Sequence, residues 1–350
     1  MLTHLRLRDF RCFDTAAVEF APDATLFLGA NGEGKTTILE AACVLLRLQS
    51  QRSTSLAPAV QIGKKSFLVA GDFDGHELEF RYGPLRRRVT FDHIEQRTLG
   101  EYLRIARVVS FANSDIDLVR GSSETRRRYL DFLGSQINPG YRPTLRSYER
   151  TLRARNALLK SPVPRPTERA AYDLPLVQHG AQLVRFRKEL AILLSPLTSN
   201  AYKQITGGRE KFELRFFPGV GENFAHDLEQ SREEELRLRQ TVVGPHRDDL
   251  ALLVDEMPAP QFGSEGQQRS VALALKVAQA RAFEITGDQT APLLLVDDIF
   301  GELDIARRNA LLDNLPAASQ KLITATAMPW RDNLPAGTIY ELHDRRLGRL

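Results

Sequence analysis

Hydrophobic and polar positions divide the chain into three stretches. From Met1 to about Arg107, apolar residues alternate with polar ones or form short runs, the pattern of β-strands. One segment there, Lys35 to about Leu48, instead has the spacing of a helix opened by a glycine-rich turn. From about Asp115 to Gln240, apolar residues recur three and four positions apart, as on the buried face of helices, and from Val242 onward strand patterns return. The pattern therefore predicts an α/β core whose two halves are separated by a long helical insertion.

The insertion helices carry no sustained heptad repeat, so no long coiled coil is expected. We expect an ATPase domain formed by 1–108 and 241–350, and a helical domain formed by 109–240. A proline-rich break is predicted at Ser161 to Pro166. The individual strands expected on this pattern are Ala24 to Leu28, Glu77 to Tyr82, Lys211 to Phe216, Leu250 to Val254, Leu293 to Val296 and Lys321 to Thr326.

Composition narrows the class of protein without naming a function. No apolar run approaches the roughly 18 to 20 residues of a membrane span, and the N-terminal residues read as a strand and not as a signal peptide. The two cysteines, Cys12 and Cys43, form no CxxC pair, which fits a reducing cytoplasm. The net charge is +4, yet ten basic and three acidic residues between Arg120 and Lys160 give that segment +7. Such a block suggests a surface for a polyanion, nucleic acid being the usual one.

The strongest chemical signal is the segment Gly29-Ala-Asn-Gly-Glu-Gly-Lys35-Thr36, which fits the P-loop pattern GxxxxGK[ST] between an apolar strand and an apolar helix. Backbone N–H groups of such a loop surround phosphates at a helix N-terminus. Lys35 would reach the β- and γ-phosphates of ATP, and the Thr36 hydroxyl would bind Mg²⁺. The alternative is a glycine-rich turn that matches by chance. The residues expected to bind the nucleotide here are Gly29, Ala30, Asn31, Gly32, Glu33, Gly34, Lys35, Thr36 and Thr37.

A second signal is an apolar run that ends in two carboxylates, Leu293-Leu-Leu-Val-Asp297-Asp298. Ligands bind at the carboxyl ends of strands in parallel sheets, where these two residues would lie. Asp297 is expected to hold the metal as the Walker B carboxylate, and Asp298 to orient or deprotonate the attacking water. A solvated strand end with two turn-favouring aspartates is the alternative.

A third signal, Ser264-Glu-Gly266-Gln267-Gln268, precedes an apolar helix from Val271 to Phe283. It resembles the Ser-Gly-Gly-Gln signature of ABC-type ATPases, with Glu265 replacing the first glycine. In those proteins this site faces the γ-phosphate held by the other subunit, so the resemblance implies a catalytic contribution from Ser264 and nucleotide contacts from Gly266 and Gln267 across a dimer. The same residues also predict a capping box, Ser264 with Gln267 three positions on.

Several further segments resemble the RecF family of SMC-like DNA repair ATPases, and the resemblance runs nearly the whole length. The segments that carry it are Leu5-Arg-Leu-Arg-Asp-Phe10-Arg11, Gly121-Ser-Ser-Glu-Thr-Arg126-Arg127-Arg128-Tyr-Leu-Asp131, Tyr148-Glu-Arg-Thr-Leu-Arg-Ala-Arg155-Asn156, Gly244-Pro-His246-Arg247-Asp248-Asp249 and Gly263-Ser-Glu-Gly-Gln-Gln-Arg269. The resemblance implies an ATP-dependent homodimer that binds double-stranded and gapped DNA, hydrolyses ATP slowly, and helps to load RecA with RecO and RecR. Thr324-Ala-Thr326 stands where transporters of the ABC type carry a switch histidine, which leaves the γ-phosphate sensor open.

The basic block suggests where DNA would bind. Arg142, Arg146, Arg150 and Arg153 are spaced four, four and three apart, along one face of a helix. Such a row suits phosphate contacts without sequence readout, and Arg126 and Arg127 are candidates to extend it. The alternative is a solvated helix face with internal pairing. Another short basic run, Arg86 to Arg88, is a weaker candidate and is read as the edge of a strand or turn.

Three other functions remain alternatives to a DNA repair ATPase. An SMC-like ATPase of a defence system would need a second catalytic centre, and the sequence shows no convincing carboxylate cluster for one. A transporter subunit is disfavoured by the long insertion and by the missing switch histidine. A nucleotide-gated scaffold would bind ATP without turnover, which substitution of Asp298 would reveal.

Overall fold

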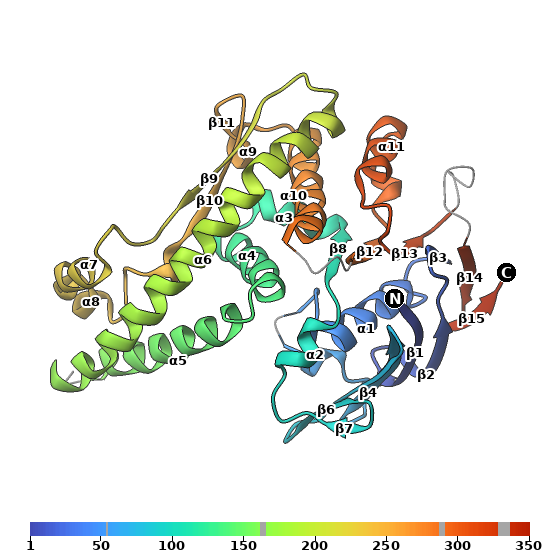
Figure 1. Ribbon diagram of the computed structural model, residues 1–350, viewed down its shortest axis with the longest axis horizontal. Coiled ribbons are helices and arrows are strands. Elements are labelled where there is room, and N and C mark those ends of the chain that lie inside the picture. The colour runs from blue at the N-terminus through green and yellow to red at the C-terminus, as the bar shows by residue number, and fades with distance from the viewer. Residues whose placement is uncertain (54, 162–165, 287–290, 328–336) are drawn as a thin grey trace. The chain divides into compact units, whose positions relative to one another are not determined.

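The computed structural model describes residues 1–53, 55–161, 166–286, 291–327 and 337–350. The chain forms two compact units, the first made of 1–114 and 283–350 and the second of 115–282. Both chain ends belong to the first unit (Figure 1). Residues 241–282, which the sequence assigned to the ATPase domain, are part of the compact second unit. The functional boundaries 1–108, 109–240 and 241–350 stay a prediction.

Two sheets form the first unit. One is antiparallel with the order β2-β1-β4-β5-β6-β7, and the other is mixed with the order β15-β14-β3-β13-β12-β8. In the mixed sheet β3, β8, β12, β13 and β14 run parallel, and only the edge strand β15 is antiparallel. The strands are β1 (Leu2–Phe10), β2 (Phe13–Glu19), β3 (Ala24–Leu28), β4 (Phe67–Phe73), β5 (His76–Tyr82), β6 (Arg87–Phe91), β7 (Ile94–Glu95), β8 (Val108–Ala112), β12 (Leu293–Asp297), β13 (Lys321–Ala325), β14 (Gly337–His343) and β15 (Arg346–Arg349).

Helix α1 (Lys35–Arg47) lies between the two sheets and forms the core of this unit. It contacts β1, β4 and β5 of one sheet and β8, β12 and β13 of the other. Twelve of its thirteen residues are buried, because a helix covered on both sides needs apolar residues around its whole circumference. It ends at Leu48, whose left-handed φ of 56° lets its N–H donate to Val44 O. The predicted helix from Lys35 is thereby confirmed.

The remaining helices of the first unit are short. They are η1 (Ala57–Ala59), α2 (Gly100–Arg104), η2 (Asn113–Ile116, which runs across the unit boundary), η4 (Phe300–Glu302) and α11 (Ile305–Asn314).

The second unit is mainly helical, with one small sheet in the order β11-β10-β9. Helices α5 and α6 pack along each other (Figure 1), with Tyr141, Tyr148 and Leu159 on the buried face of α5. Its elements are α3 (Asp117–Arg120), α4 (Ser123–Ile137), α5 (Tyr141–Leu159), α6 (Pro166–Thr206), β9 (Phe212–Phe217), α7 (Phe224–Gln230), α8 (Arg232–Leu238), η3 (Pro245–Arg247), β10 (Asp249–Val254), β11 (Met257–Pro258), α9 (Ala259–Phe262) and α10 (Glu265–Thr286), of which α10 continues into the first unit.

The strands predicted from sequence are confirmed, each to within about two residues at its ends. The predicted proline-rich break falls largely on 162–165, outside the described residues. Helix α6 is the longest, at 41 residues, and the described part of the chain contains no long coiled coil, as predicted. Among the helices of the described residues, none combines the length and the hydropathy that a membrane span requires.

Candidate functional site

The glycine-rich loop lies between β3 and α1 in the first unit, and its glycines are required by the backbone. Gly32 and Gly34 have φ values of 90° and 103°, in the left-handed region that favours glycine. A Cβ on Gly34 would also lie 2.7 Å from Phe13 Cζ. The loop leads directly into the N-terminus of α1, where unpaired N–H groups and the helix dipole favour an anion.

Lys35 holds its ammonium group over this loop. Its Nζ donates to Gly29 O at 2.5 Å and to Ala30 O at 2.9 Å. Burial lowers the pKa of Lys35, whereas the carboxylates of Asp298, Asp297 and Glu33 oppose that shift. The side chain predicted to bind phosphate is therefore buried, among carboxylates, beside the loop.

Asp297, at the end of β12, is joined to the loop by hydrogen bonds. Its Oδ1 accepts from Thr36 Oγ1 at 2.7 Å and from Thr324 Oγ1 at 2.8 Å. The parallel register sets Asp297 opposite Thr324 of β13, which is the strand between β12 and β3. The two residues predicted to bind the metal, Thr36 and Asp297, are thus in contact although 261 positions separate them.

Asp298 has a strained backbone at the end of the same strand. Its φ of 50° is left-handed, its N–H donates to Thr324 Oγ1 at 3.0 Å, and its carbonyl accepts from Asn113 Nδ2 at 3.2 Å. Burial and the neighbouring Asp297 raise the pKa of Asp298, while Lys35 opposes the shift. A carboxyl group with a raised pKa beside a phosphate-binding loop suits a general base.

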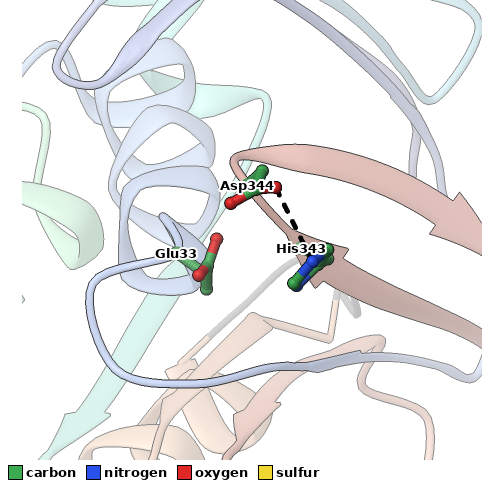
Figure 2. A group of neighbouring side chains, drawn as sticks. All are labelled: Glu33, His343 and Asp344. Atoms are coloured by element: carbon green, nitrogen blue, oxygen red, sulfur yellow. Dashed lines mark ion pairs between the residues drawn. The ribbon is translucent and has the colours of Figure 1, made fainter.

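The turn between β14 and β15 adds a group of side chains that sequence patterns did not reveal. Figure 2 shows Glu33 of the loop beside His343 and Asp344, whose ligand atoms lie within 4.8 Å of one another. The Arg345 N–H donates to Glu33 Oε2 at 3.0 Å, and a Cβ on Gly29 would lie 2.6 Å from Leu342 O. His343 and Asp344 are exposed, and Glu33 already accepts a hydrogen bond. We therefore interpret these contacts as stabilising the glycine-rich loop and do not assign a metal to them.

The signature segment belongs to the second unit. Ser264 Oγ accepts from Gln267 N at 3.2 Å, and Gln267 Oε1 accepts from Ser264 N at 2.6 Å. This is a reciprocal capping box, which confirms the cap predicted from sequence. Gln267 Nε2 also donates to Glu210 Oε1 at 2.9 Å. Ser264 and Gly266 are therefore fixed at the N-terminus of α10, an anion-favouring position.

The predicted DNA-binding arginines have two different environments. On α5, Arg146, Arg150 and Arg153 are exposed and Arg142 is half-buried, opposite the buried face of the helix. Glu149 lies 3.8 Å from Arg153 on the same helix.

Arg126 and Arg127 on α4 point into the unit. Arg126 makes a two-bond ion pair with Asp249, at 2.7 and 3.0 Å, and donates to Gly121 O. Arg127 donates to Asp248 O. Both guanidinium groups stabilise the fold of this unit, which leaves the arginines of α5 as its DNA-binding candidates.

Sequence patterns also missed a buried ionic network around Arg187 of α6. Its guanidinium is 3% exposed and bonds to Asp131, Asp248 and the carbonyl of Pro245. Arg187 follows Leu183 by four positions and so lies on the apolar face of its helix. That location is the signal that could have identified a buried charge.

The imidazole ring of His246, in the same unit, is neutral and makes two hydrogen bonds. Its Nε2 lies 3.0 Å from Thr241 O, so this nitrogen carries the proton, and its Nδ1 accepts from Tyr148 OH at 2.7 Å. Burial lowers the pKa of His246 to about 4, and Arg247, Arg127 and Arg187 contribute to the shift.

This depressed pKa predicts acid-labile folding of the second unit. As the pH falls, the unfolded state, in which the histidine pKa is near 6.5, takes up a proton before the folded state does. The free energy of unfolding is therefore at its full value above about pH 6.5 and decreases as the pH drops toward 4. A pKa lowered from 6.5 to about 4 corresponds to a loss of about 3 kcal/mol in the free energy of unfolding, at about 1.4 kcal/mol per pKa unit. Hydrogen exchange of second-unit peptides between pH 7 and 4, corrected for intrinsic exchange, measures it. His246→Gln should flatten the profile, whereas His226→Gln, at an exposed position, should not; equal profiles would contradict the assignment.

The fold and the site together define the class of this protein. The chain combines a P-loop that leads into a helix between two sheets, an acidic strand end hydrogen-bonded to that loop, and a separate capped signature segment. These features are those of an ABC-type ATPase head. The comparisons agree with this class. A family profile described as an AAA domain matches residues 4–127. The DNA replication and repair protein RecF of Gloeobacter violaceus is 35% identical over 99% of this chain and 98% of its own length.

Solved structures extend the likeness to the whole fold. A structure of the recombination mediator protein RecF with ATP, of the RecFOR pathway, has a TM-score of 0.90 and 27% identity, covering 100% of this chain and 97% of that one. An Smc head domain from Pyrococcus furiosus shares the fold at a TM-score of 0.57 and 16% identity, covering 100% of this chain and 95% of that one. The chain belongs to the RecF family of DNA replication and repair proteins.

Proposed function

We propose that this chain is an ATP-dependent DNA-binding protein of recombinational repair, a slow ATPase whose homodimer forms around ATP. The proposal rests on one observation: the two carboxylates at the end of β12 interact with the glycine-rich loop. Asp297 accepts a hydrogen bond from Thr36, and Asp298 interacts electrostatically with Lys35. RecF relatives and a RecF structure with ATP support the choice of ATP and of DNA repair. Activation of the ATPase by DNA is part of the proposal.

The residues present fit ATP and Mg²⁺. Lys35 and the N-terminus of α1 provide positive charge and N–H groups for the phosphates. Mg²⁺ prefers hard oxygen ligands, and the Thr36 hydroxyl and the Asp297 carboxylate are such a pair, already 2.7 Å apart. The metal, when bound, neutralises charge that develops on the phosphates. Asp298 would orient the attacking water and accept its proton.

A dimer would complete the site. The capped segment at Ser264 offers an anion-favouring helix N-terminus but belongs to the unit that does not contain the P-loop. In ABC-type ATPases this segment meets the nucleotide of the other subunit. We therefore assign Ser264, Gly266 and Gln267 to the γ-phosphate held by the partner copy.

DNA would contact the row Arg146, Arg150 and Arg153, with Arg142 at its end. Arginines on one exposed helix face suit the phosphate backbone and carry no sequence information. We expect double-stranded and gapped DNA as targets, with RecO and RecR as partners in loading RecA in the cytoplasm.

The test of this function compares wild type with Lys35→Ala. Loss of a charged hydrogen-bond donor should weaken ATP binding roughly 10- to 100-fold. In wild type, ATP should drive dimerisation and tight binding to gapped or duplex DNA, and Lys35→Ala should lose both. Sedimentation and fluorescence anisotropy on gapped, duplex and single-stranded DNA, with and without ATP, measure these effects.

Two outcomes would remove the DNA repair assignment. They are DNA binding that ignores ATP, and ATP turnover without any DNA binding. With either outcome, the chain would be an ABC-type ATPase with another cellular function.

Thr324→Val should raise the Mg²⁺ requirement of the ATPase. Thr324 is fully buried, and its hydroxyl fixes Asp297 and the backbone of Asp298. Loss of such a supporting hydrogen bond typically costs about 10- to 100-fold in metal affinity. Titration of ATPase rate with Mg²⁺ should show half-saturation at least about tenfold higher. Thr25→Val, at another fully buried threonine of the same sheet, is the control; equal effects would mean a loss of fold and not of metal.

A further inference from the structure

We propose that the first unit carries a second nucleic-acid contact surface, formed by two adjacent loops at one end of its antiparallel sheet. One is the loop 61–66, before β4, and the other is the hairpin segment 83–88, made of the loop 83–86 after β5 and the first two residues of β6. We call them the two-loop surface. The inference rests on the proposed DNA-binding function and adds a contact surface to the arginine row of α5.

The fold brings these loops together. Phe67, the first residue of β4, pairs with Tyr82, the last residue of β5, so the loops that precede and follow these residues lie at the same sheet end. A Cβ placed on Gly83 would lie 3.8 Å from Ser66 Cβ. Each loop is closed by its own turn, through Lys64 N to Gln61 O at 3.0 Å and Gly83 N to Arg86 O at 3.0 Å. The surface is therefore built on ordered loops.

Positive charge is in excess on this surface. The cations of the two segments are Lys64, Lys65, Arg86, Arg87 and Arg88, and Arg81 of β5 lies opposite Arg88 at their edge. Arg86 and Arg88 share the single carboxylate of Glu95, at 2.5 and 3.2 Å. Lys64 pairs with Asp9, and Arg81 with Glu79. A fourth carboxylate, that of Asp14, accepts from Gln61 Nε2 of the first loop at 2.8 Å. Six cations facing four carboxylates leave a net charge of +2.

Two of these cations have no acidic partner. Within the described part of the chain, neither Lys65 nor Arg87 has a carboxylate within ion-pair distance. The guanidinium carbon of Arg87 instead lies 5.3 Å from the centre of the Tyr82 ring, a cation–π contact. Both side chains are exposed and available to phosphate.

Each loop also presents one fully exposed aliphatic side chain. Ile62 is 100% exposed and Leu85, which follows Pro84 at the tip of its hairpin, is 99% exposed. Single exposed aliphatic residues are ordinary on protein surfaces, but here two lie on neighbouring loops, each of which also carries cations within two positions of the aliphatic residue. Proteins that bind the minor groove or deform DNA combine apolar wedges with Arg and Lys in this way. The chemistry therefore favours nucleic acid, with the cations on phosphates and Leu85 and Ile62 against exposed base or sugar surfaces.

The experiment separates the contribution of the cations to DNA affinity from that of the exposed aliphatic side chains. Anisotropy with a labelled gapped duplex, at saturating ATP and Mg²⁺ and from 50 to 200 mM salt, gives the affinity and its salt slope. Lys65→Ala/Arg87→Ala should lower affinity roughly tenfold and reduce the slope of log K against log salt by about 1.8, since each phosphate contact contributes about 0.9. Leu85→Ser should lower affinity about three- to tenfold with an unchanged slope, because the wedge makes no ionic contact. Arg104→Ala/Arg349→Ala, two exposed arginines of the same unit outside the surface, should leave both quantities as in wild type.

The outcomes distinguish this inference from the proposed function. If wild type binds DNA and Arg146→Ala/Arg150→Ala weakens it, but both two-loop variants match wild type, the inference is overturned and the proposed function stands. If the two-loop variants keep DNA binding and instead lose binding to a poly-glutamate peptide, the surface serves an acidic protein segment and the inference is equally wrong. If wild type binds no DNA, the proposed function itself fails.

Discussion

Asp298→Asn should slow ATP hydrolysis by about 10²- to 10⁴-fold while leaving ATP binding intact. The substitution keeps the shape of the side chain and removes the base that would accept the proton of the attacking water. The hydrogen bonds of its backbone to Thr324 and Asn113 do not involve the carboxylate, so the strand end should stay in place. Single-turnover hydrolysis and equilibrium ATP binding, measured on the same preparation, separate chemistry from binding.

The same substitution should prolong the ATP-bound state. If hydrolysis opens the dimer, the variant should remain dimeric on DNA after wild type has dissociated. Wild-type turnover should also fall on acidification. The pKa of Asp298 is raised, so its carboxylate becomes protonated at a higher pH than an ordinary aspartate would.

Asp313→Asn is the matched control, an exposed carboxylate on α11 of the same unit. It should leave rate and dissociation unchanged. An Asp298→Asn variant that hydrolyses ATP at the wild-type rate would rule out this residue as the base. If neither wild type nor the variant hydrolysed ATP while both bound it, the chain would be a nucleotide-gated scaffold.

Arg187→Met should destabilise the second unit by about 3–5 kcal/mol, the cost of breaking a buried ion pair from one side. The substitution leaves the carboxylates of Asp131 and Asp248 without their shared partner, and Asp248 is fully buried. Hydrogen exchange of peptides from α6 and β10 measures the loss in this unit alone, which matters because a chain of two units need not unfold in one step.

Arg185→Met, two residues earlier on the same helix, is the control. Arg185 is 65% exposed, and its 3.8 Å pair with Glu189 is an ordinary surface pair. Its loss should change stability by less than about 0.5 kcal/mol. Equal effects of the two substitutions would show that the buried network contributes nothing beyond helix propensity. Adding Asp248→Asn to Arg187→Met should recover part of the loss, because it removes one of the uncompensated charges.

Local patterns were sufficient to predict much of this protein. The P-loop and the helix that follows it are contiguous in sequence, and their glycines are required by local backbone geometry, as the left-handed φ of Gly34 shows. The capping box of Ser264 and Gln267 spans only three residues and could be predicted with its partners. Apolar periodicity placed the strands and the long helices, because one face or both faces of each must be buried.

Contacts between distant segments could not be predicted in this way. Periodicity placed the arginine row on one face of α5 but gave no sign that Arg126 pairs with Asp249, 123 positions away. The neutral state of His246 follows from its burial by the fold, and its Nδ1 is bonded to Tyr148 of another helix, 98 positions away. The two-loop surface exists only because β4 and β5 pair at one sheet end.

The sequence by itself therefore determined the class of ATPase, the phosphate-binding loop and the candidate acidic residues, since each depends on a short run of neighbouring residues. The tertiary structure alone decided which charges are exposed and which are buried. A guanidinium group has the same identity on either side of a helix, but its free energy depends on the carboxylates and the solvent that the fold places around it.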